Sequence, residues 1–71
     1  MTVTIDARGL TCPEPLKLLA RSISNSSAKT FLVETTDPVA RIDIPAWCHM
    51  RKLEYRGCES HSDFDVHTIV R

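Results

Sequence analysis

The N-terminal part of the chain changes from a strand-like to a helix-like spacing of apolar residues. Residues 3–6 alternate apolar and polar side chains, which predicts a short strand, and residues 8–11 have the character of the loop that ends it. The next apolar positions recur at i, i+3, i+4 and i+7, at Leu16, Leu19, Ala20 and Ile23. This spacing predicts a helix that begins at Pro13 and ends at the polar residues 25–27.

The middle of the chain predicts an interior strand and a second helix. Residues 30–36 are rich in β-branched and aromatic side chains, with apolar residues on both faces, as in a strand inside a sheet. The pair Asp37-Pro38 interrupts this pattern. Asp43, followed two residues later by Pro45, predicts the start of a helix that runs to about Leu53. The positions expected to face inward are Ile44, Trp47 and Cys48.

The C-terminal part predicts a hairpin of two strands, residues 55–60 and 64–70, joined by a turn at residues 61–63. In the last strand one set of positions alternates, at Phe64, Val66, Thr68 and Val70. His67 is out of phase with this set, so we expect it to face solvent. The resulting order is β-α-β-α-β-β, and right-handed crossovers place both helices on one face of a four-stranded sheet.

Length and composition limit the classes of protein. A chain of 71 residues with 42% hydrophobic and 25% charged side chains predicts one folded domain over residues 1–71. Nine basic against nine acidic residues give no net charge, which argues against direct nucleic-acid binding. We see no secretory signal or membrane-length apolar run and expect no membrane partner. The three cysteines, at positions 12, 48 and 58, form no CxxC pair, so we expect free thiols in the cytoplasm.

Cys12 has the strongest chemical signal. It precedes a predicted helix, whose first N–H groups and dipole favour a thiolate over a thiol. Pro13 fixes the entry to the helix and Glu14 suits its positive end. Pro15, like Pro13, has no N–H, so we expect the few donors that remain in the first turn to point at the sulfur, and Arg8 would add a positive charge. We therefore expect a thiol pKa below the usual value of about 8.5. The alternative is that a cysteine is simply an acceptable small residue at the start of a helix.

Two separated segments resemble the TusA-like (SirA-like) sulfur-carrier family. The first, Asp6-Ala7-Arg8-Gly9-Leu10-Thr11-Cys12-Pro13-Glu14-Pro15, is similar to the family's Asp-Ala-x-Gly-Leu-x-Cys-Pro-x-Pro signature. The second, Asp37-Pro38 followed by Asp43-Ile44-Pro45-Ala46-Trp47-Cys48, is similar to the family's Asp-Pro loop and the opening of its second helix. The resemblance covers nearly the whole chain. It implies an α/β fold, a two-layer sandwich with a four-stranded mixed sheet and two helices on one face.

The resemblance also implies a function, that of a sulfurtransferase acting as a sulfur carrier. Family members accept a sulfane sulfur as a persulfide on the cysteine of the Cys-Pro-x-Pro motif, here Cys12, and pass it to a partner's cysteine. The residues that would support this site belong to the same motif: Arg8, Gly9, Pro13, Glu14 and Pro15. The implied donor is a cysteine desulfurase or a rhodanese-like protein, and the acceptor is a protein with a reactive cysteine, such as a DsrE-like protein. The sulfur would serve tRNA thiolation, sulfur oxidation or molybdenum-cofactor assembly.

Other interpretations remain beside this one. The alternative function is a noncatalytic redox-regulatory or protein-interaction module on the same fold. We expect Cys48 to be structural, because it lies on the apolar side of a predicted helix, and Cys58 to be incidental. A metal site around Cys58, His61 and His67 is not expected, because the spacing is poor and the histidines should face solvent. We expect no bound cofactor and, since Cys12 must be open to two partners, a monomer.

Overall fold

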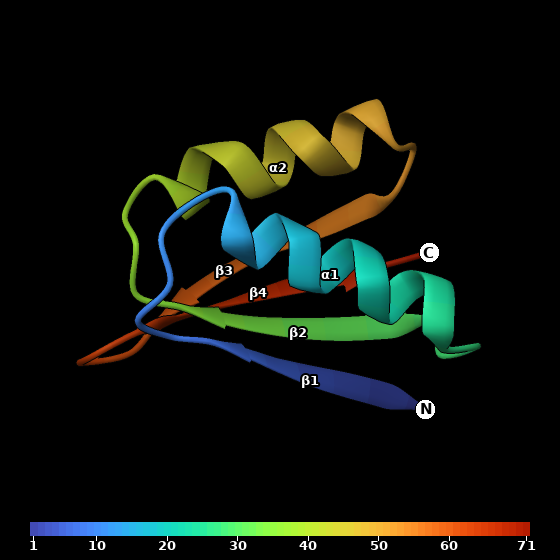
Figure 1. Cartoon of the computed structure of the whole chain (residues 1–71), viewed down its shortest axis with the longest axis horizontal. Helices are drawn as coiled ribbons and strands as arrows, with labels where there is room; N and C mark the ends of the chain where they lie inside the picture. Colours follow the sequence, from blue (N-terminus) through green and yellow to red (C-terminus); the bar gives the residue numbers. More distant parts are fainter.

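Four strands form one mixed sheet in the order β1-β2-β4-β3 in the computed structural model, which describes residues 1–71 (Figure 1). In chain order the elements are β1 (Thr2–Ala7), α1 (Glu14–Asn25), β2 (Thr30–Thr35), α2 (Ala40–Met50), β3 (Glu54–Ser60) and β4 (Asp65–Val70). β1 is parallel to β2, and β4 is antiparallel to both β2 and β3. Both helices lie on one face of the sheet (Figure 1). The predicted two-layer α/β architecture is confirmed.

The hydrophobic core lies between this face of the sheet and the two helices. Its buried members are Ile5, Ala7, Leu19, Ala28, Phe31, Val33, Ala40, Ile44, Cys48 and Ile69. Complete burial of a side chain the size of leucine or phenylalanine stabilises the fold by about 1.5–3 kcal/mol. β2 has the interior place predicted for it, between β1 and β4. Trp47, expected inside, is half-buried and packs against the edge of the core.

The face of β4 that packs against the core is not the one predicted from the sequence. Its buried residues are Asp65, His67 and Ile69, while Val66, Thr68 and Val70 are half-buried on the open face of the sheet. The prediction that His67 faces solvent is therefore wrong. Both faces of this interior strand carry apolar residues, so the alternation of hydrophobic positions alone selected the wrong one.

α2 begins at Ala40, before the predicted start at Asp43. The start signal is Asp37, whose carbonyl oxygen accepts the N–H of Ala40 at 3.0 Å and whose carboxylate accepts the N–H of Val39 at 3.0 Å. Pro45 consequently lies inside the helix rather than in its first turn. The pair Asp37-Pro38, interpreted as a break, thus lies directly before the second helix and leads into it.

Other boundaries differ by a few residues from the predicted ones, as helix ends commonly do. α1 begins at Glu14 with Pro13 just before it, and α2 ends at Met50 rather than near Leu53. Neither helix is long and apolar enough to cross a membrane.

The carboxyl ends of β1 and β2 meet at one edge of the sheet, because these neighbouring strands are parallel. The loop after β1 leads to α1, and the loop after β2 leads to α2 (Figure 1). Residues 8–13 and 36–39 are thereby brought together at this edge, which is where open α/β sheets usually place their functional groups.

Candidate functional site

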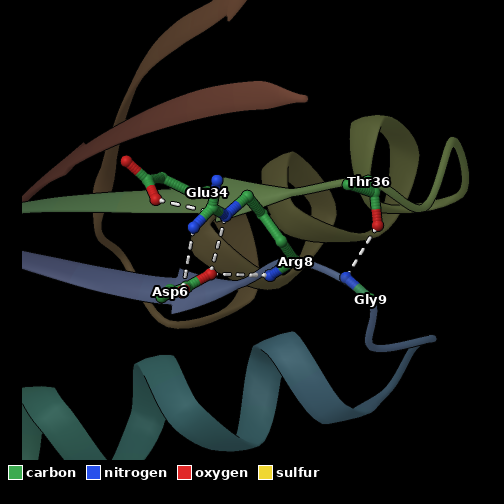
Figure 2. A network of polar contacts seen from close by, with 5 residues as sticks. All are labelled: Asp6, Arg8, Gly9, Glu34 and Thr36. Carbon is green, nitrogen blue, oxygen red and sulfur yellow. Dashed lines mark hydrogen bonds and ion pairs between the residues drawn. The ribbon is translucent and has the colours of Figure 1, made fainter. Parts of the chain in front are cut away.

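Cys12 lies in the loop between β1 and α1, at the edge where β1 and β2 end. Its backbone N–H donates to Oδ2 of Asp37 at 2.9 Å, which ties this loop to the segment before α2. The N–H of Gly9 donates to Oγ1 of Thr36 at 2.8 Å and joins the same two loops (Figure 2). Cys12 carries a free thiol that is partly buried against the core. The two loops therefore hold one thiol at a defined place near the surface.

The conformation of Gly9 explains the glycine in this loop. Its φ is +81°, in the left-handed region that side chains with a Cβ rarely adopt. The turn around it is closed by the N–H of Leu10, which donates to the carbonyl oxygen of Ala7 at 3.3 Å. Gly9 thus lets the chain reverse directly after β1 and approach Thr36.

The first turn of α1 leaves few backbone donors for the sulfur of Cys12. Pro13 precedes the helix and Pro15 lies in its first turn, and neither has an N–H. The N–H of Glu14 donates to the carbonyl oxygen of Thr11 at 2.9 Å. The expected activation of the thiol by the start of the helix therefore lacks most of its donors.

The pKa of the Cys12 thiol is raised to about 11, the opposite of the direction expected from the sequence. Burial is the largest cause, a hydrogen bond to the carboxylate of Asp43 comes second, and the negative charges of Asp43 and Asp37 add to both. Each of these favours the neutral thiol over the thiolate. At neutral pH the resting protein therefore holds Cys12 mostly protonated.

Arg8 directs its guanidinium group to the side of the sheet that no helix covers. Its Nε lies 3.0 Å from Oδ1 of Asp6 and 3.7 Å from Oε1 of Glu34 (Figure 2). The Cζ atom lies 5.4 Å from the ring centre of Phe64. We expected this charge beside Cys12, and the structure pairs it instead with two carboxylates on the open face.

The other motif residues and thiols take different places. Glu14 is exposed and forms an ion pair of 3.4 Å with Lys17. Cys48 is fully buried in α2, and burial raises its pKa to about 11. Its surroundings are those of a small apolar core residue, in agreement with the structural role expected for it. Cys58 is exposed on β3.

Sequence analysis missed Asp37 and Asp43 as neighbours of the thiol, although both lie in the second matching segment. The signal that could have found them is the parallel pairing of β1 and β2. Two parallel neighbours end at the same edge, so residues just after the second strand must approach the loop after the first. Asp37 follows β2 directly, and Asp43 lies one turn into α2.

Comparisons with known proteins agree with this description. The family model described as Sulfurtransferase TusA matches residues 3–71 of the chain. Among solved structures, the chain is similar to a SirA-like protein from Desulfitobacterium hafniense, with a TM-score of 0.82 and 21% sequence identity. The alignment covers 99% of this chain and 96% of that one. At this identity the structural likeness concerns the fold.

Proposed function

The chain belongs to the TusA family of sulfurtransferases, and we propose that it is a sulfur carrier that holds sulfane sulfur as a persulfide on Cys12. The observation that supports this most is the placement of a free thiol in a loop that Asp37 fixes at the edge of the sheet. Cys48 is fully buried, out of reach of a partner's cysteine. Cys58 is exposed but lies outside both matching segments, so Cys12 is the thiol within a partner's reach that the motif favours.

Each transfer is a displacement at sulfur. The Cys12 thiol loses its proton, and the resulting thiolate attacks the outer sulfur of a donor persulfide. A new S–S bond forms on Cys12 while the donor's S–S bond breaks, and the donor cysteine leaves as a thiolate. An acceptor thiolate then attacks the outer sulfur on Cys12 in the same way and releases the Cys12 thiolate. The electrons balance without an external oxidant or reductant.

The raised pKa of Cys12 has consequences for both displacements. A thiol of high pKa gives a strong nucleophile, yet only a small fraction is thiolate near neutral pH, and the same sulfur leaves slowly. Burial, the largest cause of the raised pKa, would remain in a complex, but the part due to Asp43 and Asp37 weakens when their negative charge is offset. Basic side chains on a docked partner would supply that offset, so transfer would be fastest within the complex and the free carrier would stay unreactive.

The partners proposed here are those that the resemblance to the TusA-like family implies. We propose a cysteine desulfurase or a rhodanese-like protein as donor and a protein with a reactive cysteine, such as a DsrE-like protein, as acceptor, each presenting basic residues to the Cys12 loop. The sulfur would go to tRNA thiolation, sulfur oxidation or cofactor assembly in the cytoplasm. Arg8, Gly9, Pro13 and Pro15 would support the site by shaping the loop rather than by contacting sulfur.

A labelling experiment tests the proposal. The protein is incubated with a cysteine desulfurase and cysteine that carries radioactive sulfur. The label bound to the protein is measured before and after a reductant is added. Wild type and Cys58→Ser should carry label that the reductant removes, whereas Cys12→Ser should carry none. Label retained on Cys12→Ser would place the sulfur elsewhere, and no label on any variant would favour the noncatalytic interaction module.

A further inference from the structure

A second group of polar side chains lies between α2 and the hairpin of β3 and β4. Asp65 and His67 are buried on the helix-facing side of β4, and Cys58 on β3 is paired with His67 in the register of the two strands. The sulfur of Cys58, a carboxylate oxygen of Asp65 and a ring nitrogen of His67 all lie within 4.8 Å of one another. We call these three residues the β3–β4 cluster. None of them takes part in the chemistry proposed for Cys12.

A β-bulge brings Cys58 into this cluster. The pairing of β3 with β4 shifts between Tyr55 and Gly57, which leaves Arg56 without a direct partner. Side chains alternate along a strand, so in an unbroken register Cys58 would face away from the helices. The shift turns it to the side of His67. Gly57 has a φ of +130°, a conformation that favours glycine, so the bulge is fixed by the local sequence.

We propose that the β3–β4 cluster binds a zinc ion through Sγ of Cys58, a carboxylate oxygen of Asp65 and Nδ1 of His67, with water as the fourth ligand. Thiolate, imidazole and carboxylate are the ligand types that zinc takes, at bond lengths of about 2.0–2.3 Å. Such bonds place neighbouring ligand atoms roughly 3.5 Å apart in a tetrahedron. The ligand atoms now lie within 4.8 Å of one another, so binding would draw them closer, and the exposed Cys58 side chain has room to move.

His67 is already oriented for this role. Its Nε2 lies 3.1 Å from Oγ1 of Thr35 on β2, and its Nδ1 lies 2.9 Å from the hydroxyl of Tyr55 on β3. β2 and β3 flank β4 on opposite sides, so Nδ1 is the nitrogen directed toward Cys58. Zinc would replace the bond between Nδ1 and Tyr55, and in that state Nε2–H would donate to Thr35 and hold the ring in place. Burial lowers the pKa of His67, which favours the neutral ring that a metal needs.

Asp65 is held as an anion by Arg41. Nε of Arg41 lies 2.7 Å from Oδ2 and Nη2 lies 3.1 Å from Oδ1, and this pairing lowers the pKa of the carboxyl. A carboxylate has about four lone-pair directions, so two bonds from Arg41 and one from the side chain of Ser60 leave one direction for a metal. The Arg41 side chain is 57% exposed and can adjust. Zinc binding would release the Cys58 proton to solvent, so affinity should rise with pH.

The test uses the metal-free 71-residue chain, zinc in competition with a coloured chelator, and cobalt as a spectroscopic probe. Wild type should bind one equivalent of zinc, and its cobalt form should show a thiolate-to-cobalt charge-transfer band. Cys58→Ser should lose the band and weaken zinc affinity about tenfold or more, because it removes the only sulfur ligand. Cys12→Ser, the matched cysteine control, should keep both. Absence of stoichiometric binding, or an unchanged band in Cys58→Ser, would overturn the assignment.

Two further variants separate this site from the nearby hairpin turn. Thr35→Val removes the bond that orients His67 and should lower zinc affinity about 10–100-fold, with folding checked by circular dichroism. His61→Gln alters an exposed histidine that pairs with Glu59 and should leave affinity unchanged. Loss of binding in His61→Gln alone would move the metal to the turn and contradict the proposal.

Discussion

The carboxylate of Asp37 accepts the backbone N–H of Cys12 at 2.9 Å, although 25 positions separate the two residues in the chain. The same carboxylate accepts the N–H of Val39 at the start of α2. One side chain therefore positions both the loop that carries the thiol and the second helix. Burial is the main reason that the pKa of the Cys12 thiol is raised, and the negative charge of Asp37 adds to it together with Asp43.

Neutralising Asp43 should lower the pKa of Cys12. Asp43→Asn removes the charge and the carboxylate acceptor that favour the neutral thiol, so the thiolate should form at lower pH. The measurement is the rate of iodoacetamide alkylation against pH in a Cys58→Ser background, where Cys12 is the accessible thiol. Asp63→Asn, a change in the exposed hairpin turn, serves as the control and should leave the midpoint unchanged. An Asp43→Asn midpoint equal to wild type would show that this carboxylate does not govern the thiol.

Removing the Cys48 sulfur should affect stability and not sulfur loading. The side chain is fully buried, so Cys48→Ala should lower the free energy of unfolding by about 1–3 kcal/mol through lost packing. Urea denaturation measures this, with Cys58→Ala as the exposed counterpart that should change little. A stable Cys48→Ala that no longer accepts sulfur would give this residue a chemical role instead.

Gly9 offers a test of the loop geometry. Alanine at a φ of +81° costs about 1–2 kcal/mol, since the Cβ approaches the following carbonyl oxygen. Gly9→Ala should therefore be less stable than wild type and should place Cys12 less accurately, which slows sulfur transfer. Gly9→Asn should lose less stability and less transfer rate than Gly9→Ala, because asparagine tolerates the left-handed region. Equal stability of all three proteins would mean that the loop does not depend on this conformation.

Local patterns predicted the elements and their order, while contacts between distant segments decided what the patterns missed. The apolar spacing around Leu19 and the β-branched run at residues 30–35 both come from side chains that pack in the core. The pattern therefore identified both elements correctly. Pro45 suggested a helix start, but the side chain and carbonyl of Asp37 already begin α2. A proline inside a helix and a proline at its start are hard to distinguish from sequence alone.

The faces of β3 and β4 depend on partners that the sequence does not reveal. His67 is buried because Thr35 and Tyr55 satisfy its two nitrogens, and these residues lie on two other strands. The bulge before Cys58 reverses the alternation of β3 and has no signal stronger than a single glycine. The direction of the Cys12 pKa shift was missed for a similar reason, because it depends on tertiary packing. Burial of the thiol against the core is the largest cause, and the carboxylate of Asp43 adds to it from a separate helix.

His67 should make the protein less stable in mild acid. Burial lowers its pKa from the ordinary 6.5, so below that pH the unfolded chain takes up a proton that the folded chain does not. The stability that depends on the neutral ring is present above pH 6.5 and is lost as pH falls toward the lowered folded pKa. His67→Gln should remove this part of the pH dependence, measured by urea denaturation from about pH 7.5 to 5. His61→Gln, at an exposed position, should keep it, and an unchanged slope in His67→Gln would contradict the explanation.

The most direct test of the sulfur-carrier account is the intact mass of the protein after incubation with a cysteine desulfurase and cysteine, followed by mapping of the modified peptide. The account predicts a gain of one sulfur atom on the peptide that contains Cys12, reversed by a reductant and missing in Cys12→Ser. A gain located on Cys58, or no gain while the same donor loads a known acceptor, would contradict the assignment of Cys12 as the carrier.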